Sequence, residues 1–411
     1  MRHPRKTIAV IAWATLFMGL PGSHARAQSG DEGGAAVTPG WVFTPTVSIG
    51  AIHDDNPVLA GRGSATPDDI VTSVRPGVDL TLVRKHTFLG MGYRGSLQRY
   101  RTLDEYDNFA QGGYFELRHQ PSRRYTLTVR DNFSASPTTD MVEVAGVPFS
   151  RTGTQSNNLD AALVASLTKR LQISGDYHFQ WFKFDRSEEP ISSVLQGGRA
   201  HSVTVGARQS LTSRLKLGGD YTIQRANTGQ PPVVGGGEPL QIPSFTIQNA
   251  VGSVTYQITP TIVVDGGAGL SYLSLPGEIA RTGPAGHVSL SKRTEHAFLT
   301  FSARRSFVPA FGFGGSVSNQ EVLATVRVPF ARKRAYVDGS ISWRDSEPVL
   351  EQELRLKSLW LKTSVGYAFQ RWLRLEAFYD GTFQDTRIAG GQVDRNRIGV
   401  QVVTARPMRL N

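Results

Sequence analysis

The feature that most constrains the fold is an alternation of apolar and polar residues, which residues 171–181 show most clearly. Their odd positions carry Leu, Ile, Gly, Tyr, Phe and Trp, whereas their even positions carry Gln, Ser, Asp, His and Gln. Successive side chains of a strand point to opposite faces, so the stretch predicts a strand with one apolar and one polar face. Its length suits a tilted crossing of a bilayer. A soluble β-sandwich uses the same pattern, so one such strand does not decide between the two folds.

The same alternation recurs from Trp41 onward, and it predicts about 18 strands, within a range of 16 to 18. Short connections such as 169–170 and 213–214 alternate without a break with long ones such as 135–155 and 227–244. Outer-membrane barrels have short periplasmic turns and longer outer loops, whereas the crossing links of a sandwich would not alternate so regularly. The sequence therefore predicts an all-β fold, a transmembrane antiparallel up-and-down β-barrel with both termini on the periplasmic side.

The N-terminus has the composition of a secretory signal. A basic start precedes an apolar run over residues 8–20, and Ala25-Arg26-Ala27 forms an A-x-A site that predicts cleavage after Ala27. Residues 28–40 are small and polar and predict a flexible periplasmic lead-in, and residues 41–411 form the expected barrel. Together these features predict export to the outer membrane of a Gram-negative bacterium.

Composition narrows the alternatives further. The chain has no cysteine, so disulfide frameworks and thiol chemistry are excluded. Its mean hydropathy is −0.24 and no later apolar run approaches 18 residues, which excludes transmembrane helices. The formal net charge of +11 includes four basic residues of the leader, Arg2, Arg5, Lys6 and Arg26, so the exported chain carries +7.

The polar face of the predicted strands carries charges of both signs. Because Arg or Lys on the lipid face near the midplane costs about 2–4 kcal/mol, these residues are expected inside the barrel. The charged candidates for lining the lumen are Arg75, Asp79, Arg94, Glu116, Arg118, Arg130, Asp176, Arg208, Lys216, Asp220, Asp265, Arg304, Arg327, Asp338, Arg344, Arg374 and Glu376. The aromatic candidates on the same face, where a sugar could stack, are Tyr114, Tyr336, Trp360 and Phe378.

A lumen of this width is too large for side chains alone to fill. Two interpretations follow, a hydrated passage for polar solute or a lumen plugged by long loops. Loops 135–155 and 227–244 are candidate gates, and the Pro/Gly-rich composition of the second suggests a flexible cover.

Other patterns carry little chemistry. His53-Asp54-Asp55-Asn56 has cation-binding residue types without the spacing of a calcium loop, so we expect no metal. His178 lies near Asp176 with no aligned nucleophile, so we expect neither an enzyme nor a cofactor. The basic turns, such as 332–334, are expected to lie near anionic lipid headgroups or a periplasmic partner, and not on nucleic acid.

Two segments carry a family resemblance. Residues 45–59, P-T-V-S-I-G-A-I-H-D-D-N-P-V-L, followed by residues 67–80, P-D-D-I-V-T-S-V-R-P-G-V-D-L, resemble the beta-barrel porin type 2 family. The resemblance implies an outer-membrane barrel associated with exopolysaccharide export. The expected partners are then outer-membrane lipid and lipopolysaccharide, a polysaccharide polymer and periplasmic export proteins.

The residues themselves leave three hypotheses open. The first is a porin-like channel that serves as the exit for a secreted exopolysaccharide, which rests on the resemblance. The second is a general or nutrient-uptake porin, and the third a non-conducting structural or adhesive barrel that displays its surface loops.

Overall fold

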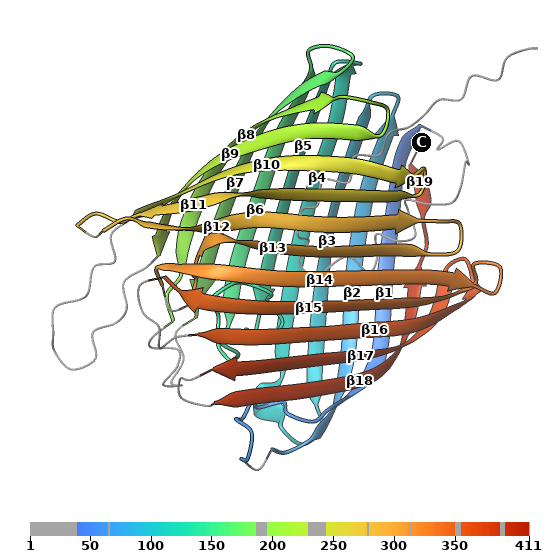
Figure 1. The fold of residues 1–411 in the computed structure, drawn as a ribbon. Helices are drawn as coiled ribbons and strands as arrows, with labels where there is room; N and C mark the ends of the chain where they lie inside the picture. Colours follow the sequence, from blue (N-terminus) through green and yellow to red (C-terminus); the bar gives the residue numbers. More distant parts are fainter. Residues whose placement is uncertain are drawn as a thin grey trace, which may run out of the picture.

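A computed structural model describes residues 39–64, 66–185, 195–228, 244–277, 279–312, 314–349, 355–386 and 391–410. These residues form a closed antiparallel β-barrel (Figure 1). The predicted signal peptide, its cleavage site and residues 28–38 of the lead-in lie outside the described residues. The all-β prediction and the expected number of strands are confirmed.

The strands follow the alternating pattern, and each is longer than the 9–11 residues that a tilted crossing needs. They are β1 Gly40–Asp54, β2 Asp69–Arg84, β3 Thr87–Tyr100, β4 Asn108–Ser122, β5 Tyr125–Ser136, β6 Thr154–Ser166, β7 Leu171–Phe184, β8 Gly198–Ser210, β9 Leu215–Thr228, β10 Phe245–Thr259, β11 Ile262–Ser274, β12 Arg281–Arg293, β13 Phe298–Pro309, β14 Ser316–Phe330, β15 Ala335–Pro348, β16 Leu356–Gln370, β17 Leu373–Thr386 and β18 Gln392–Ala405. A short 3₁₀ helix, η2 Asp104–Tyr106, lies between β3 and β4. Among the described residues, no helix is long and apolar enough to cross a membrane.

The barrel closes between its first and last long strands. Each strand pairs with its neighbours in chain order, and β1 also pairs with β18 from Thr46↔Ala405 to Asp54↔Arg397. A short final strand, β19 Met408–Leu410, extends this seam by pairing with residues 41–43 of β1. Closure satisfies the backbone hydrogen bonds that an edge strand would leave open, which a bilayer requires.

The two faces of the sheet differ as the alternation predicts. Outward side chains are apolar and exposed, as at Val205 (56%), Leu270 (60%) and Ile398 (58%). The opposite face carries the charged residues, which pair across neighbouring strands. An apolar belt around a polar interior is the architecture of a membrane-spanning barrel of the outer-membrane type.

The two ends of the barrel also differ. At the end where the C-terminus lies, tight turns join the strands, while the longer connections lie at the other end (Figure 1). The short-turn end is strongly basic: six of its eight turns carry Arg or Lys, a seventh directly follows Lys292 and Arg293 at the end of β12, and Glu295 is the only acid in these turns. We call the basic residues of this end the basic rim: Arg84, Lys85, Arg123, Arg124, Lys169, Arg170, Arg214, Lys292, Arg293, Arg332, Lys333, Arg334, Arg371, Arg406 and Arg409.

Candidate functional site: the barrel interior

The connection between β5 and β6, residues 137–153, folds into the barrel. Val142 and Val147 of this loop pack in a buried cluster with Phe182 of β7 and Ile247 of β10. The same loop also hydrogen-bonds to strands β16 and β17, which lie far from β7 around the barrel. A single loop can reach both parts of the wall only through the interior. We call residues 137–153 the inward loop.

The inward loop is braced from within. The Thr139 hydroxyl donates to the carbonyl of Pro148 (2.6 Å) and accepts a hydrogen bond from the backbone N–H of Ser150 (2.6 Å). The Thr139 N–H donates in turn to the Ser150 carbonyl (3.0 Å). These bonds join the two arms of the loop at its base, so the backbone polar groups that it buries are paired locally.

Strands β16 and β17 hold the tip of the loop. The Trp360 indole N–H donates to the carbonyl of Asp140 (3.0 Å), and the ring of Phe149 packs on Trp360 with centroids 5.6 Å apart. Gln384 accepts from the Phe149 N–H (2.7 Å) and donates to the carbonyl of Val147 (3.2 Å). At the edge of this contact, the Lys362 ammonium lies 2.6 Å from the Glu143 carboxylate. The loop is thus bound to the wall by direct hydrogen bonds.

A buried ion triad joins the loop to the seam of the barrel. The Arg395 guanidinium of β18 contacts Asp54 at the end of β1 and lies 2.9 Å from the Asp140 carboxylate of the loop. These side chains are only 2%, 1% and 0% exposed, respectively. Burial alone would raise the pKa of the Asp140 carboxyl, but Arg395 and Arg397 hold that pKa below its usual value. Asp140 is therefore ionised and paired at neutral pH.

The apolar cluster beside the loop fills the outer end of the interior. It contains Phe182, Phe245, Leu273 and Phe311, each 0–1% exposed, from the strands opposite the ion triad and from the loop after β13. At Gly146, with φ of 73°, the inward loop approaches so closely that a Cβ would lie 2.6 Å from the Cβ of Ala310. The outer ends of these strands turn apolar residues inward to meet the loop.

Nearer the short-turn end, the predicted charged residues form cross-strand pairs that remain in contact with solvent. Their Arg side chains are about one-third exposed. The pairs are Arg94–Asp79 (3.1 Å), Arg130–Glu116 (3.2 Å), Arg208–Asp220 (3.2 Å) and Arg327–Asp338 (2.5 Å). The interior therefore has a packed zone at the outer end and a solvent-exposed zone below it.

Between these zones the wall of β13–β17 carries a group of arginines. Arg304 and Arg344 both contact Glu321, at 3.2 and 3.3 Å. Arg374 lies 3.6 Å from Glu376, which also accepts a hydrogen bond from Tyr336. Two guanidinium nitrogens of the buried Arg344 have no hydrogen-bond partner among the described residues. These side chains could hold a polar solute that reaches them.

The remaining charged candidates lie outside the cross-strand ion pairs and the arginine group described above. Arg75 lies over the ring of Phe378, 5.8 Å from its centroid. Asp265 accepts from Thr255 (2.6 Å) and contacts His287 (2.7 Å). Lys216 lies on β9 opposite Thr255. Arg118 and Asp176 belong to none of the ion pairs of the described residues.

The predicted aromatic residues lie against the wall. Tyr114, Tyr336 and Phe378 stand directly opposite Gly92, Gly366 and Gly399 on the neighbouring strands. In each pair a Cβ on the glycine would lie 2.4–2.5 Å from the ring, so the rings cover the glycines. Trp360 is 3% exposed beneath Phe149. Their visible role is packing.

The residues that fasten the loop, namely Asp140, Gln384 and Arg395, are not marked by the alternating pattern of the sequence. One signal was available. Residues 137–153 contain Val142, Val144, Val147 and Phe149 with only three charged residues, which is unusual for a loop surrounded by water. Asp54, one of the cation-binding residue types in His53-Asp54-Asp55-Asn56, pairs with Arg395. Among the described residues, no group of three or more His, Cys, Asp or Glu could hold a metal ion.

Comparisons with known proteins yield structural likenesses only. No family model matches the chain, and no curated protein matches it. OccAB4 from Acinetobacter baumannii is 8% identical, with 90% of this chain and 98% of that chain covered and a TM-score of 0.44. OpdQ from Pseudomonas aeruginosa is 10% identical, with the same coverage and a TM-score of 0.45. OpdK from Pseudomonas aeruginosa, solved with vanillate, is 8% identical over 90% and 99% of the two chains, with a TM-score of 0.42.

At these identities the likeness transfers neither a substrate nor the role of any residue. The resemblance to the beta-barrel porin type 2 family stays an expectation from sequence.

Proposed function

We propose that the chain is an outer-membrane diffusion channel for small polar solutes, and that the inward loop sets its narrowest point. The observation that carries this proposal is the crossing of the interior by residues 137–153, which bind strands on the far side through Trp360 and Gln384. A loop in this position reduces the cross-section available to a solute, while the solvent-exposed ion pairs below it keep the rest of the path polar.

The inward loop favours small solutes over an extended polymer. A polysaccharide exit needs a wide path through the outer end, where the apolar cluster around Phe182 and Ile247 and the loop itself lie. No contact among the described residues points to a polymer, so export rests on the sequence resemblance alone. A non-conducting barrel would need the inward loop and the apolar cluster beside it to close the cross-section completely.

Conductance across a planar bilayer tests the proposal. The purified protein should give discrete current steps. A variant with residues 140–149 replaced by a short Gly-Ser linker should give steps several-fold larger and admit larger sugars in a vesicle-swelling assay. A matched control that lacks residues 230–242, the other candidate gate, should keep the wild-type step size.

Two outcomes would contradict the proposal. Absence of current steps in the wild-type protein would favour a structural or adhesive barrel. Current steps that increase equally in both shortened variants would show that the inward loop does not set the narrowest point. A deletion strain that loses surface polysaccharide, and regains it with the intact gene, would restore the export hypothesis.

A further inference from the structure

The strongest feature that the proposed channel does not use is the basic rim. Its residues are exposed, and they lie in or directly beside seven of the eight short turns and after β18, so they surround the mouth of the barrel. Only the Thr259-Pro260-Thr261 turn has no basic residue in it or directly beside it. The fifteen basic residues exceed the net charge of +7 on the exported chain, so the rest of that chain is net acidic. Positive charge is therefore concentrated at the short-turn end of the barrel.

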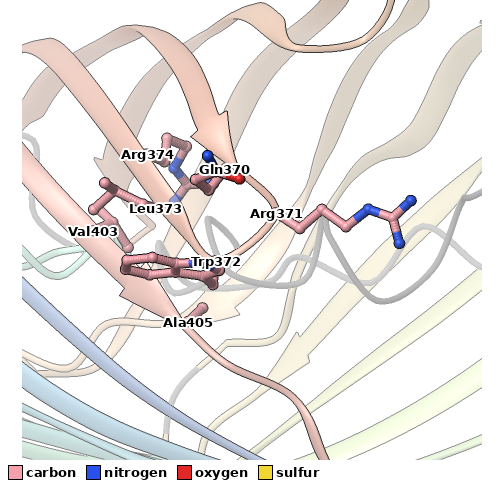
Figure 2. Close-up of a pocket in the computed structure, with 7 residues that line it drawn as sticks. All are labelled: Gln370, Arg371, Trp372, Leu373, Arg374, Val403 and Ala405. Carbon is pink, nitrogen blue, oxygen red and sulfur yellow. The ribbon is translucent and has the colours of Figure 1, made fainter.

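The rim lies directly beyond the apolar belt. Tyr125 (46% exposed) is adjacent to Arg124, and Phe330 (45%) is two residues from Arg332. At the turn between β16 and β17, Trp372 lies beside Val403 and Ala405 while Arg371 extends away from the strands (Figure 2). The cleft at this turn has a volume of only about 10 Å³, so it holds no ligand larger than water.

This order of residues fixes the depth of the charges. Aromatic side chains at the edge of an apolar belt lie at the level of the lipid headgroups, and long basic side chains beside them extend into the same layer. The rim charges therefore lie where phosphate groups of the periplasmic leaflet lie.

The turn between β14 and β15 adds an independent observation. Ala331, Arg332 and Lys333 have φ of 49°, 56° and 66°, a left-handed conformation that only glycine adopts freely. The turn nevertheless carries two cations in this conformation and a third at Arg334. All of them are exposed, and none belongs to an ion pair of the described residues.

We propose that the basic rim binds a ring of anionic phospholipid headgroups in the periplasmic leaflet of the membrane. A ring of charge at headgroup depth matches a surrounding lipid layer, whereas a soluble protein would meet a patch on one side. The chain's own lead-in could not neutralise the rim, because residues 28–39 contain only two acids, Asp31 and Glu32. The proposal holds whether or not the interior conducts.

Trp372 offers a local reporter of the lipid composition at the rim. The other tryptophans of the exported chain are replaced by Phe, and the protein is placed in vesicles of zwitterionic phosphatidylethanolamine with increasing brominated phosphatidylglycerol. Bromine quenches tryptophan on contact. We expect an association constant for the anionic lipid at least about fivefold above that for the zwitterionic lipid, the ratio that one basic residue near the lipid supplies. The ratio should fall in 1 M salt.

Two charge variants and a second reporter localise the effect. The first variant is R123Q/R124Q/K169Q/R170Q, and the purified barrel that carries it should retain less anionic lipid, as counted by mass spectrometry. The second variant adds R371Q and R406Q to the Trp372 reporter, which should then lose its preference for phosphatidylglycerol. R101Q/R199Q/R281Q/R305Q removes the same number of charges from the opposite end and should change neither measurement. A chain with Trp181 alone, near the outer end of β7, should show no preference once its cross-strand neighbour is neutralised by R199Q.

The proposal is overturned if Trp372 shows no preference for phosphatidylglycerol, or if both four-residue variants retain equal anionic lipid. Binding of soluble polyglutamate to the rim, without any lipid preference, would overturn it in favour of a soluble anionic partner. Heat-modified migration on a gel verifies that each variant has folded.

Discussion

At the scale of single residues, the interior depends on close contacts between aromatic rings and glycines. Tyr336 stands opposite Gly366, and a Cβ on that glycine would lie 2.4 Å from the ring. The ring thus covers backbone that would otherwise be exposed, and its hydroxyl reaches Glu376. The sequence placed Tyr336 on the inner face, but a binding role and a packing role look the same in an alternating pattern.

Gly366→Ala is expected to destabilise the barrel by about 1–3 kcal/mol, because the added methyl group displaces the Tyr336 ring. Gly175→Ala is the matched control, since nothing lies within 4 Å of its Cβ position. That substitution should be neutral or stabilise slightly. Urea unfolding in lipid vesicles, followed by tryptophan fluorescence, measures both. Equal effects of the two substitutions would contradict the packing role of Tyr336.

The binding of the inward loop to the barrel wall should depend on pH through the ionisation of Asp140. The pKa of this carboxyl is below its usual 3.8 in the folded protein, so its ionised form stabilises the seated loop. That contribution is fully present above pH 4 and is lost as the pH falls through the lowered pKa. The protection of residues 137–153 against hydrogen exchange, relative to the intrinsic exchange rate at each pH, should therefore fall below about pH 4 in the wild type. Asp140→Asn should remove this pH dependence, and an unchanged profile would exclude Asp140 as its source.

At the scale of elements, the sequence predicted the strands well and the loops poorly. A strand can be predicted from consecutive residues alone, because the alternation of apolar and polar side chains is a local pattern. The strand predicted at residues 171–181 accordingly lies within β7. The inward loop follows no local rule. Its position depends on Gln384 and Arg395, more than 200 residues away, and a single sequence carries no signal of such pairings.

Gln384→Ala should loosen the inward loop while the strands stay intact. The substitution leaves the Phe149 N–H and the Val147 carbonyl unpaired in a buried site, at a cost of about 1–3 kcal/mol each. Hydrogen exchange should rise across residues 137–153 and remain unchanged in β7 and β16. Gln172→Ala, which loses a bond to Ser166 far from the loop, is the control and should leave loop exchange unaltered.

At the scale of the whole molecule, the barrel is a membrane protein because its two faces differ at every strand. Val205 and Thr204 are adjacent in the middle of β8, yet Val205 faces lipid and Thr204 faces inward, where its hydroxyl bonds Thr222 (2.8 Å). Neither residue would reveal the fold alone. The repetition of this difference around the closed sheet does.

Val205→Arg should cost about 2–4 kcal/mol of folding free energy in a bilayer, since it places a charge on the lipid face near the midplane. Thr204→Arg adds the same side chain one residue away on the polar face and should cost less. Urea titration of both variants in lipid vesicles gives the comparison. A larger loss for Thr204→Arg would mean that the faces are assigned the wrong way round.

The buried ion triad also bears on the order in which the protein is made. Asp54 ends the first strand, Asp140 lies in a loop roughly a third of the way along, and Arg395 arrives only with the last long strand. Until β18 pairs with β1, the loop has no arginine to hold it. A half-built barrel, which lacks β16 to β18, would therefore contain an unanchored loop, and the step that completes the wall is the same step that adds the last of the loop's anchors.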